Sequence, residues 1–393
     1  MKLFHLSDLH IGRQLQMYSL VEAQKNVFDQ ILRAITDEKP DAVLIAGDVY
    51  DKSVPSSEAF DLLNELLVQL SEIEPAVPVL IISGNHDNNL RLNYASHFME
   101  KNKIFIAANP PQKKDEHLKK VTLQDEYGEV NIYLLPFTRP ADVRNLYGDE
   151  REIRDFNDAV AALIERENID YSERNILVSH QFYVADGKEP ERRDSEMRYI
   201  SVGGLDNVDI SHVEKFDYVA LGHIHSAQKV GMEHIRYCGT PIKYSVSEAG
   251  DNKSITIVEL GEKNTEPVIS YLSLAMKPDV VKLRGTLQEV IDMADAELKK
   301  SYVHITLTDE ECGFRPKDSL MEYFDNIIEV VIDNRRTRAE LSNDMEATEN
   351  ISPETAFVNF YQEMNGQPMS DAEKKLLMDV ISTISGKEKE DSI

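Results

Sequence analysis

Short apolar runs alternate with amphipathic stretches through residue 275. Five continuous runs have the length and composition of buried strands, and they span residues 3–6, 42–46, 79–82, 176–178 and 219–221. Residues 20–36 and 57–73 instead repeat apolar side chains every three or four positions, which predicts helices with one buried face. Residues 130–135 and 255–260 look like further strands. This order predicts an α/β domain at 1–275, with two packed sheets flanked by helices.

The pattern restarts after Lys277-Pro278. Residues 280–283, 303–307 and 327–332 are expected to form strands, and residues 287–299 a helix. These elements are sufficient for a small α+β domain, which we place at 278–334.

Two helical signals follow a polar linker at 335–351. Ser352-Pro353 places an N-cap before a proline at the first helical position, and Ser370-Asp371-Ala372-Glu373 is a capping box. We therefore expect a helix pair at 352–385 and a disordered charged tail at 386–393. The apolar faces of the pair could dock into a groove of a partner protein or fold back onto the body of this chain.

Length and composition indicate a soluble globular protein of two or three domains. The chain has 393 residues, of which 41% are hydrophobic and 29% charged. Its two cysteines, Cys238 and Cys312, have no metal-binding spacing and suggest a reducing compartment. No signal peptide or membrane-spanning run is evident, so we expect a cytoplasmic protein without a membrane partner.

The net charge of −27 argues against a nucleic-acid partner, because binding to phosphates requires local Lys and Arg. Part of the acidity lies at the C-terminus, where residues 341–393 contain 11 acidic and 4 basic residues. Bound metal ions would cancel a further part within a site.

Potential metal ligands follow each of the five predicted buried strands. The segments that contain them are Asp8-Leu9-His10, Gly47-Asp48-Val49-Tyr50-Asp51, Gly84-Asn85-His86-Asp87, Ser179-His180 and Gly222-His223-Ile224-His225. Side chains placed just past the carboxyl ends of strands converge on one edge of a sheet, where α/β folds place their active sites. A mixture of carboxylate, amide oxygen and imidazole suits two divalent cations, which predicts a two-metal phosphoesterase.

The ligands can be divided between the two cations. Asp8 and His10 alternate along a backbone that we expect to be extended, so both would face one metal, with His225 as the third ligand. Asp48 is the candidate bridge, since its two carboxylate oxygens can hold two cations.

The remaining members of the motifs complete the predicted site. Asn85, His180 and His223 would bind the second metal. His86 is the candidate general acid, which would protonate the leaving oxygen. Asp51 and Asp87 would orient neighbouring imidazoles and backbone.

In this order the motifs resemble those of the calcineurin-like metallophosphoesterases and, within them, the SbcD family of bacterial nuclease subunits. The closer resemblance rests on residues 47–55 (GDVYDKSVP), residues 84–92 (GNHDNNLRL), Gly239-Thr240-Pro241 and Ser247-Glu248-Ala249. It implies a four-layer αββα sandwich with a small α+β capping domain and a C-terminal helix pair. It also implies the seven ligands named above, with His86 near the leaving group.

The activity implied by this resemblance is Mn²⁺-dependent cleavage of DNA phosphodiester bonds in the repair, recombination and replication of DNA. The expected reactions are 3′→5′ exonuclease action on duplex ends and endonuclease action on hairpins or single strands. The 278–334 domain would contact DNA, and the 352–385 helices would bind an SbcC-type, SMC-like ATPase. Two nuclease subunits would dimerise through helices such as 57–71, within a heterotetramer at the nucleoid.

Two other functions stay open. A calcineurin-like phosphoesterase acting on nucleotides or phosphoproteins would use the same metal ligands. A non-enzymatic scaffold on this fold would be expected to lack several ligands, whereas none is missing here.

Overall fold

The computed structural model describes residues 1–148, 151–196, 206–310, 316–337, 355, 357–358, 360–362 and 367–378. The predicted tail at 386–393, and parts of the predicted linker and helix pair, lie outside these residues. No helix within the described ranges is long and apolar enough to cross a membrane.

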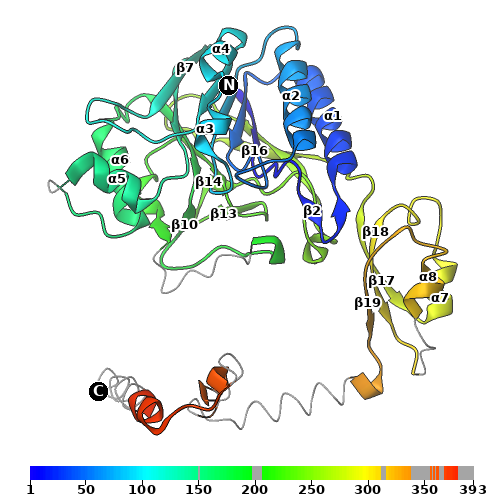
Figure 1. Cartoon of the computed structure of the whole chain (residues 1–393). Coiled ribbons are helices and arrows are strands. Elements are labelled where there is room, and N and C mark those ends of the chain that lie inside the picture. The colour runs from blue at the N-terminus through cyan, green and yellow to red at the C-terminus, as the bar shows by residue number, and fades with distance from the viewer. Residues whose placement is uncertain are drawn as a thin grey trace. The chain divides into compact units, whose positions relative to one another are not determined.

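Two six-stranded sheets form the body of the chain (Figure 1). The first has the order β16-β15-β1-β4-β5-β6 and comprises β16 (Val268–Ser273), β15 (Ser254–Glu259), β1 (Lys2–Leu6), β4 (Ala42–Ala46), β5 (Val79–Ile82) and β6 (Ile104–Ala107). The second has the order β13-β14-β12-β9-β8-β7 and comprises β13 (Gln228–Val230), β14 (Met232–Tyr237), β12 (Tyr218–Gly222), β9 (Arg174–His180), β8 (Gly128–Leu135) and β7 (Lys119–Asp125). All the strands predicted before residue 275 are confirmed.

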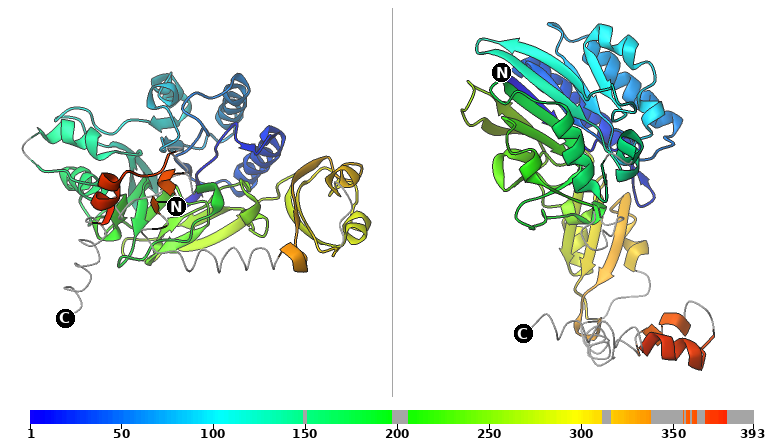
Figure 2. Two further views of the ribbon diagram at one scale, coloured as in Figure 1. Left: turned by 60° about the horizontal axis from the view of Figure 1, so that its bottom comes forward. Right: turned by 90° about the vertical axis from the view of Figure 1, so that its left-hand side faces the viewer.

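Helices cover the outer faces of both sheets (Figures 1 and 2). They are α1 (Val21–Glu38), α2 (Ser57–Ser71), α3 (Asn89–Leu92), α4 (Ser96–Met99), α5 (Pro140–Tyr147) and α6 (Phe156–Arg166). Two short strand pairs lie outside the large sheets: β2 (Gln14–Leu15) with β3 (Tyr18–Ser19), and β10 (Phe182–Val184) with β11 (Asn207–Asp209). The 3₁₀ turns are η1 (Glu100–Asn102), η3 (Asp194–Glu196), η4 (Ile210–His212) and η5 (Val246–Glu248).

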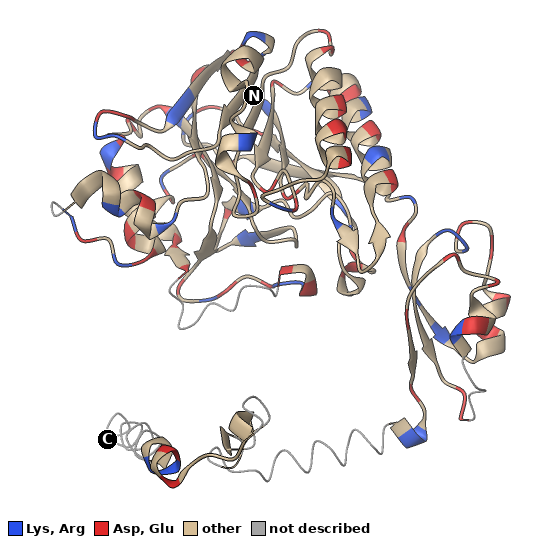
Figure 3. Cartoon of the chain, viewed as in Figure 1, with Lys and Arg blue, Asp and Glu red and all other residues tan. Residues whose placement is uncertain are grey.

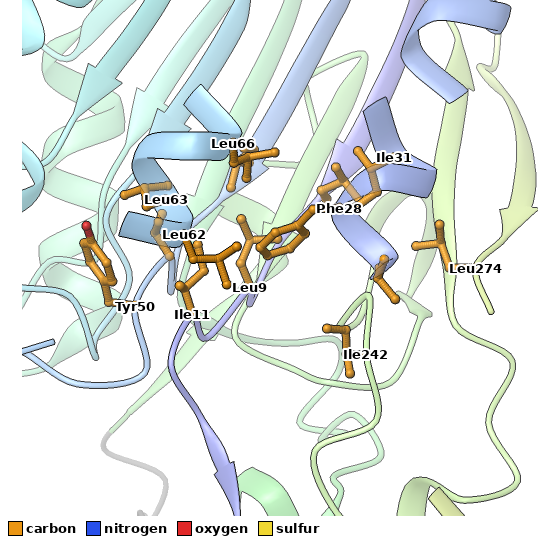
Figure 4. Close-up of a cluster of buried hydrophobic side chains, with 14 of the residues drawn as sticks. Leu9, Ile11, Phe28, Ile31, Tyr50, Leu62, Leu63, Leu66, Ile242 and Leu274 are labelled. Atoms are coloured by element: carbon orange, nitrogen blue, oxygen red, sulfur yellow. The ribbon is translucent and has the colours of Figure 1, made fainter. Parts of the chain in front are cut away.

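The central strands are buried on both faces, which explains their continuous apolar sequences. Ala42, Leu44 and Ala46 of β4 point into the core between the two sheets, while Val43 and Ile45 point into the core beneath the helices. That second core includes Phe28 of α1 and Leu62, Leu63 and Leu66 of α2 (Figure 4). A third core packs α5 and α6 on the other sheet. The predicted four-layer αββα sandwich is therefore confirmed.

The small α+β module contains β17 (Val280–Gly285), β18 (Tyr302–Leu307) and β19 (Asn326–Ile332), which form one sheet in that order. Its helices are α7 (Leu287–Asp292) and α8 (Pro316–Leu320). The helix predicted at 287–299 is too long. Asp295 accepts hydrogen bonds from the backbone of Glu297 and Leu298, and this local turn replaces the helical ladder.

The chain divides into two compact units, one of residues 1–283, 290–305 and 317–330, and one of residues 284–289, 306–316 and 331–393. This division crosses the three strands of the small module, so the boundaries proposed from sequence stay a prediction. In the second unit the capping box at 370–373 is formed. The Glu373 carboxylate accepts from the Ser370 backbone nitrogen at 2.8 Å, and residues 371–378 are helical.

Candidate metal centre

All seven predicted ligands meet at one rim of the sandwich. They lie at or just past the carboxyl ends of β1, β4 and β5 in the first sheet and of β9 and β12 in the second. β1, β4 and β5 pair in parallel, as do β9 and β12, so the ends that bear the ligands lie together.

Asp8, His10 and His225 form one group of ligand atoms, all within 4.8 Å of one another. The Nε2 atoms of His10 and His225 are 3.1 Å apart, and His10 Nε2 is 3.9 Å from Asp8 Oδ1. Two imidazole nitrogens that face each other at this distance need a proton or a cation between them, which fits a shared metal ion.

Asn85, His180 and His223 form the second group. The Asn85 side-chain oxygen lies 3.1 Å from His180 Nε2 and 3.0 Å from His223 Nδ1. His180 Nδ1 donates to the Ala46 carbonyl at 2.7 Å, which leaves Nε2 as the lone-pair nitrogen that faces the site.

Asp48 lies between the two groups. Its Oδ2 is 3.4 Å from His180 Nε2 and 3.7 Å from His10 Nε2, while Oδ1 accepts from the His86 backbone nitrogen. These carboxylate, amide-oxygen and imidazole ligands therefore fit two divalent cations that share the Asp48 carboxylate.

Four of these residues have a left-handed backbone. The φ angles are 52° at Asp8, 39° at His10, 50° at Asp48 and 106° at His223. The expected extended alternation of Asp8 and His10 was therefore wrong. β1 ends at Leu6, and the chain then turns sharply so that backbone bonds from Asp8 to Gly47 and from His10 to Asp48 join the two loops. Such strain, at four non-glycine residues, is typical of functional sites.

Two glycines lie so close to neighbouring groups of the centre that no side chain fits there. A β-carbon on Gly84 would lie 2.1 Å from Asp48 Oδ1, and one on Gly222 would lie 1.9 Å from the Ala46 carbonyl oxygen. Any side chain at either position would displace the groups around Asp48.

At four of the six titratable ligands the electrostatics favour the protonation state that a metal ion requires. The other two would release a proton when cations bind: burial raises the pKa of Asp8 to about 7, and the Asp48 carboxylate raises the pKa of His180 to about 9 despite its burial. Burial alone would raise the pKa of Asp48, but the surrounding imidazoles, His180 above all, hold it well below its usual value. Burial lowers the pKa of His223 to about 3, and also lowers those of His10 and His225. Neutral imidazoles around an ionised carboxylate are the forms that bind divalent cations.

His86, Asp51 and Asp87 lie around the seven candidate ligands. His86 Nδ1 donates to the Asp51 carbonyl at 2.8 Å, and its ring packs edge-on against His10 with centroids 4.9 Å apart. The Asp51 carboxylate lies 3.6 Å from His10 Nδ1. Asp87 accepts backbone hydrogen bonds from Val49, Tyr50 and Gly84, and so joins the loops after β4 and β5.

Sequence reasoning missed a group of residues behind His225. Ser195 Oγ lies 2.7 Å from His225 Nδ1 and donates to Glu248 at 2.7 Å. Glu248 is fully buried and is paired with Lys253 at 2.6 Å. The Ser247-Glu248-Ala249 motif could have pointed to Glu248, but Ser195 lies in no motif. A second missed residue, the buried Gln24 of α1, donates to the carbonyl oxygens of Leu9 and His10.

An open pocket of about 580 Å³ lies over the centre. Besides metal-binding candidates, its walls include three cationic side chains, Arg13, Lys52 and Arg139. Arg13 is held by the Ser195 carbonyl at 2.9 Å and by Asp51 at 3.3 Å. The pocket therefore combines cation sites with positive side chains, which suits a phosphate ester.

Comparison with known proteins agrees with this geometry. The family model described as calcineurin-like phosphoesterase matches residues 1–227, and that described as type 5 capsule protein repressor C-terminal domain matches residues 277–365. The chain is 30% identical to the D subunit of nuclease SbcCD from Staphylococcus epidermidis, over 99% of this chain and all of the relative. It is 28% identical to the protein of that name from Staphylococcus saprophyticus, over 98% of each chain.

Among solved structures, GAP50, the anchor in the inner membrane complex of Plasmodium, matches 70% of this chain and 84% of its own. The TM-score is 0.40 at 13% identity, so this likeness adds nothing to the assignment. The first family model covers the five ligand-bearing segments through His225. The chain belongs to the calcineurin-like phosphoesterase family.

Proposed function

We propose that this protein is the nuclease subunit of an SbcCD-type complex and hydrolyses DNA phosphodiester bonds with two divalent cations. The observation that carries the proposal is the convergence of seven ligand side chains, with Asp48 between the other six. The full-length similarity to the D subunit of nuclease SbcCD supports DNA as the substrate.

The side chains suggest a division of labour. Asp8, His10 and His225 would hold one cation, Asn85, His180 and His223 the other, and Asp48 both. When bound, the cations would supply an activated water and polarise the phosphoryl oxygens. We propose that both cations are Mn²⁺.

His86 would act as the general acid. Its Nδ1–H bond to the Asp51 carbonyl fixes the ring and leaves Nε2 as the nitrogen that can deliver a proton to the leaving oxygen. An alkoxide leaves badly without such a proton, so His86 would matter more for DNA than for esters with good leaving groups.

Arg13, Lys52 and Arg139 would contact the phosphates on either side of the scissile bond. The walls of the same pocket include four carboxylates, those of Asp48, Asp51, Asp87 and Glu196. Acidic and basic positions are intermixed along much of the ribbon (Figure 3). Two divalent cations would make the pocket locally positive in a chain whose net charge is −27, and the three basic side chains would add to that charge.

The exposed apolar side chains of the C-terminal segment support a protein partner. Phe360 and Leu376 are 57% and 66% exposed, and Phe357 and Met378 are exposed as well. We infer that these helices bind an SbcC-type, SMC-like ATPase. Deleting residues after 350 should abolish copurification with that ATPase and leave DNA cleavage by the isolated nuclease intact; retained copurification would contradict the assignment.

A second apolar surface would join two copies of the nuclease. A groove of about 400 Å³ runs between α2 and the α3–α4 segment, and its walls include Tyr94, which is 80% exposed, as well as Phe60 and Phe98. We propose that this surface forms a homodimer within a heterotetramer. Such a complex would act at the nucleoid in the repair, recombination and replication of DNA.

The proposal is tested by digesting end-labelled duplex DNA with Mn²⁺ beside a phosphomonoester and a cyclic nucleotide. We expect the highest kcat/KM on DNA, with 3′→5′ shortening of duplex ends and cutting of hairpins. Rapid hydrolysis of the monoester or the cyclic nucleotide with intact DNA would favour the other family activity instead.

A further inference from the structure

A smaller cavity of about 210 Å³ opens beside the metal centre. It shares Asn85, His223 and Arg139 with the larger pocket over the metal ligands, so the two spaces adjoin. Its other walls include three phenylalanines, Phe137, Phe156 and Phe182. We call this cavity the aromatic pocket.

Two of the phenylalanines contact the histidines that would bind the second cation. The Phe182 ring packs edge-on against His223, with centroids 6.2 Å apart, and Phe137 packs edge-on against His180 at 6.4 Å. Phe156, at the first position of α6, contacts Phe137 with centroids 5.9 Å apart. A ligand in the aromatic pocket would therefore be a direct neighbour of a phosphate bound at the cations.

Arginine side chains stack on two of these rings. The Arg192 guanidinium lies 4.2 Å from the centroid of Phe182, and that of Arg139 lies 5.6 Å from the centroid of Phe137. Phenylalanine and arginine planes together are the surfaces on which proteins stack single-stranded bases. The Arg139 guanidinium in the pocket wall would also attract the phosphate attached to such a base, although the wall holds one carboxylate as well, that of Asp206.

The size of the aromatic pocket limits its occupant. It is smaller than the ~300–1,000 Å³ pockets that bind drug-sized ligands, so it suits one ring system. A base pair would be too large, and the base would have to leave the helical stack before it could enter.

We propose that the aromatic pocket receives the unstacked base of a nucleotide adjacent to the scissile phosphate, an inference that rests on the proposed DNA nuclease function. The base would be held mainly through its ring faces. Because every base has such faces, the pocket would require a base without selecting a sequence.

The test uses single-stranded oligonucleotides in which one base is replaced by an abasic tetrahydrofuran unit. The unit is placed in turn on the 3′ side and the 5′ side of each of the terminal bonds, and kcat/KM is measured bond by bond. For the wild-type protein, we expect loss of one of the two flanking bases to slow cleavage of that bond by roughly tenfold, as expected for one lost stacking contact.

Phe156→Ala should cleave the intact oligonucleotide more slowly and so lower the ratio of the intact to the abasic rate, because one of the three rings of the pocket is gone. Phe137→Leu is a milder change, and it should lower the ratio of the intact to the abasic rate by a smaller amount. The matched control is Tyr127→Ala, which removes a half-exposed aromatic ring from the turn between β7 and β8 and should keep the wild-type ratio.

A second readout does not depend on turnover. 2-Aminopurine at the sensitive position should gain fluorescence on binding to wild-type protein, because it leaves its neighbouring bases, and gain less on binding to Phe156→Ala. Equal cleavage of intact and abasic strands by the wild type, or an unchanged ratio in Phe156→Ala, would overturn the aromatic pocket while leaving the nuclease function standing. Failure to cut any DNA would overturn the proposed function itself.

Discussion

Ser195 Oγ lies 2.7 Å from Nδ1 of His225 and hydrogen-bonds at the same distance to the buried carboxylate of Glu248. Since the serine hydroxyl donates to Glu248, it accepts from His225 Nδ1–H. This arrangement fixes the tautomer of His225 with its Nε2 lone pair directed toward His10, where a cation would bind. Lys253 balances the charge of Glu248.

Ser195→Ala should therefore weaken one of two divalent-cation sites. Loss of such an orienting bond typically lowers metal affinity by about 10- to 100-fold. Calorimetric titration with Mn²⁺ would measure this loss, and Ser195→Thr, which keeps the hydroxyl, should restore tight binding. Equal affinity in Ser195→Ala and the wild type would show that the contact does not orient His225.

Gln24 holds the loop that bears His10. Its side-chain nitrogen donates to the carbonyls of Leu9 and His10, and its oxygen accepts from the Gly12 backbone at 3.1 Å. Gln24→Leu keeps the volume but leaves two buried carbonyl groups and the partly buried Gly12 nitrogen without these bonds. We expect it to lower the free energy of unfolding by about 3 kcal/mol. Urea denaturation would measure the change.

The matched control for this prediction is Gln124→Leu, the same substitution at an exposed position of β7. It should change the free energy of unfolding by less than about 0.5 kcal/mol. Similar losses in the two variants would mean that the bonds made by Gln24 contribute little.

Asp125 pairs with the buried Arg174 and with the N-terminal ammonium of Met1. The hydrogen bond from Arg174 holds the pKa of Asp125 well below its usual range. A depressed folded-state pKa stabilises the protein above the unfolded value of about 3.9, and this contribution disappears as the pH falls further.

Asp125→Asn should thus cost about 3 kcal/mol at pH 7, and the difference from wild type should shrink below about pH 4. Denaturant unfolding at a series of pH values would follow it, with Glu126→Gln in the same turn as a charge control. A cost that does not change with pH would contradict the role of this ion pair.

His86→Ala should retain the metal ions and lose most turnover on DNA, because the loss of a general acid typically costs about 10²- to 10⁴-fold in rate. Hydrolysis of bis(4-nitrophenyl) phosphate, which has a good leaving group, should fall much less. Equal losses on both substrates would argue against proton donation by His86.

The sequence predicted the strands and the side chains that meet at the rim because both depend on local patterns. Continuous apolar runs such as 42–46 mark strands buried on both faces, and each ligand-bearing segment directly follows one of these strands. The length of α7 was wrong because a single side chain, Asp295, competes for the backbone.

The residues that hydrogen-bond to the candidate ligands could not be predicted from local patterns. Ser195 is distant in sequence from the segment that bears Glu248 and Lys253, and the two segments meet His225 only through the tertiary fold. The left-handed backbone at Asp8 and His10 was missed because neither residue type signals it as glycine does.

Titration of the metal-free protein with Mn²⁺ tests the central claim most directly. We predict about two ions per chain for the wild type and a clear loss of affinity at both sites in Asp48→Asn, because Asp48 would bridge them. Fewer than two ions in the wild type, or two tightly bound ions in Asp48→Asn, would contradict a pair of cations that share this carboxylate.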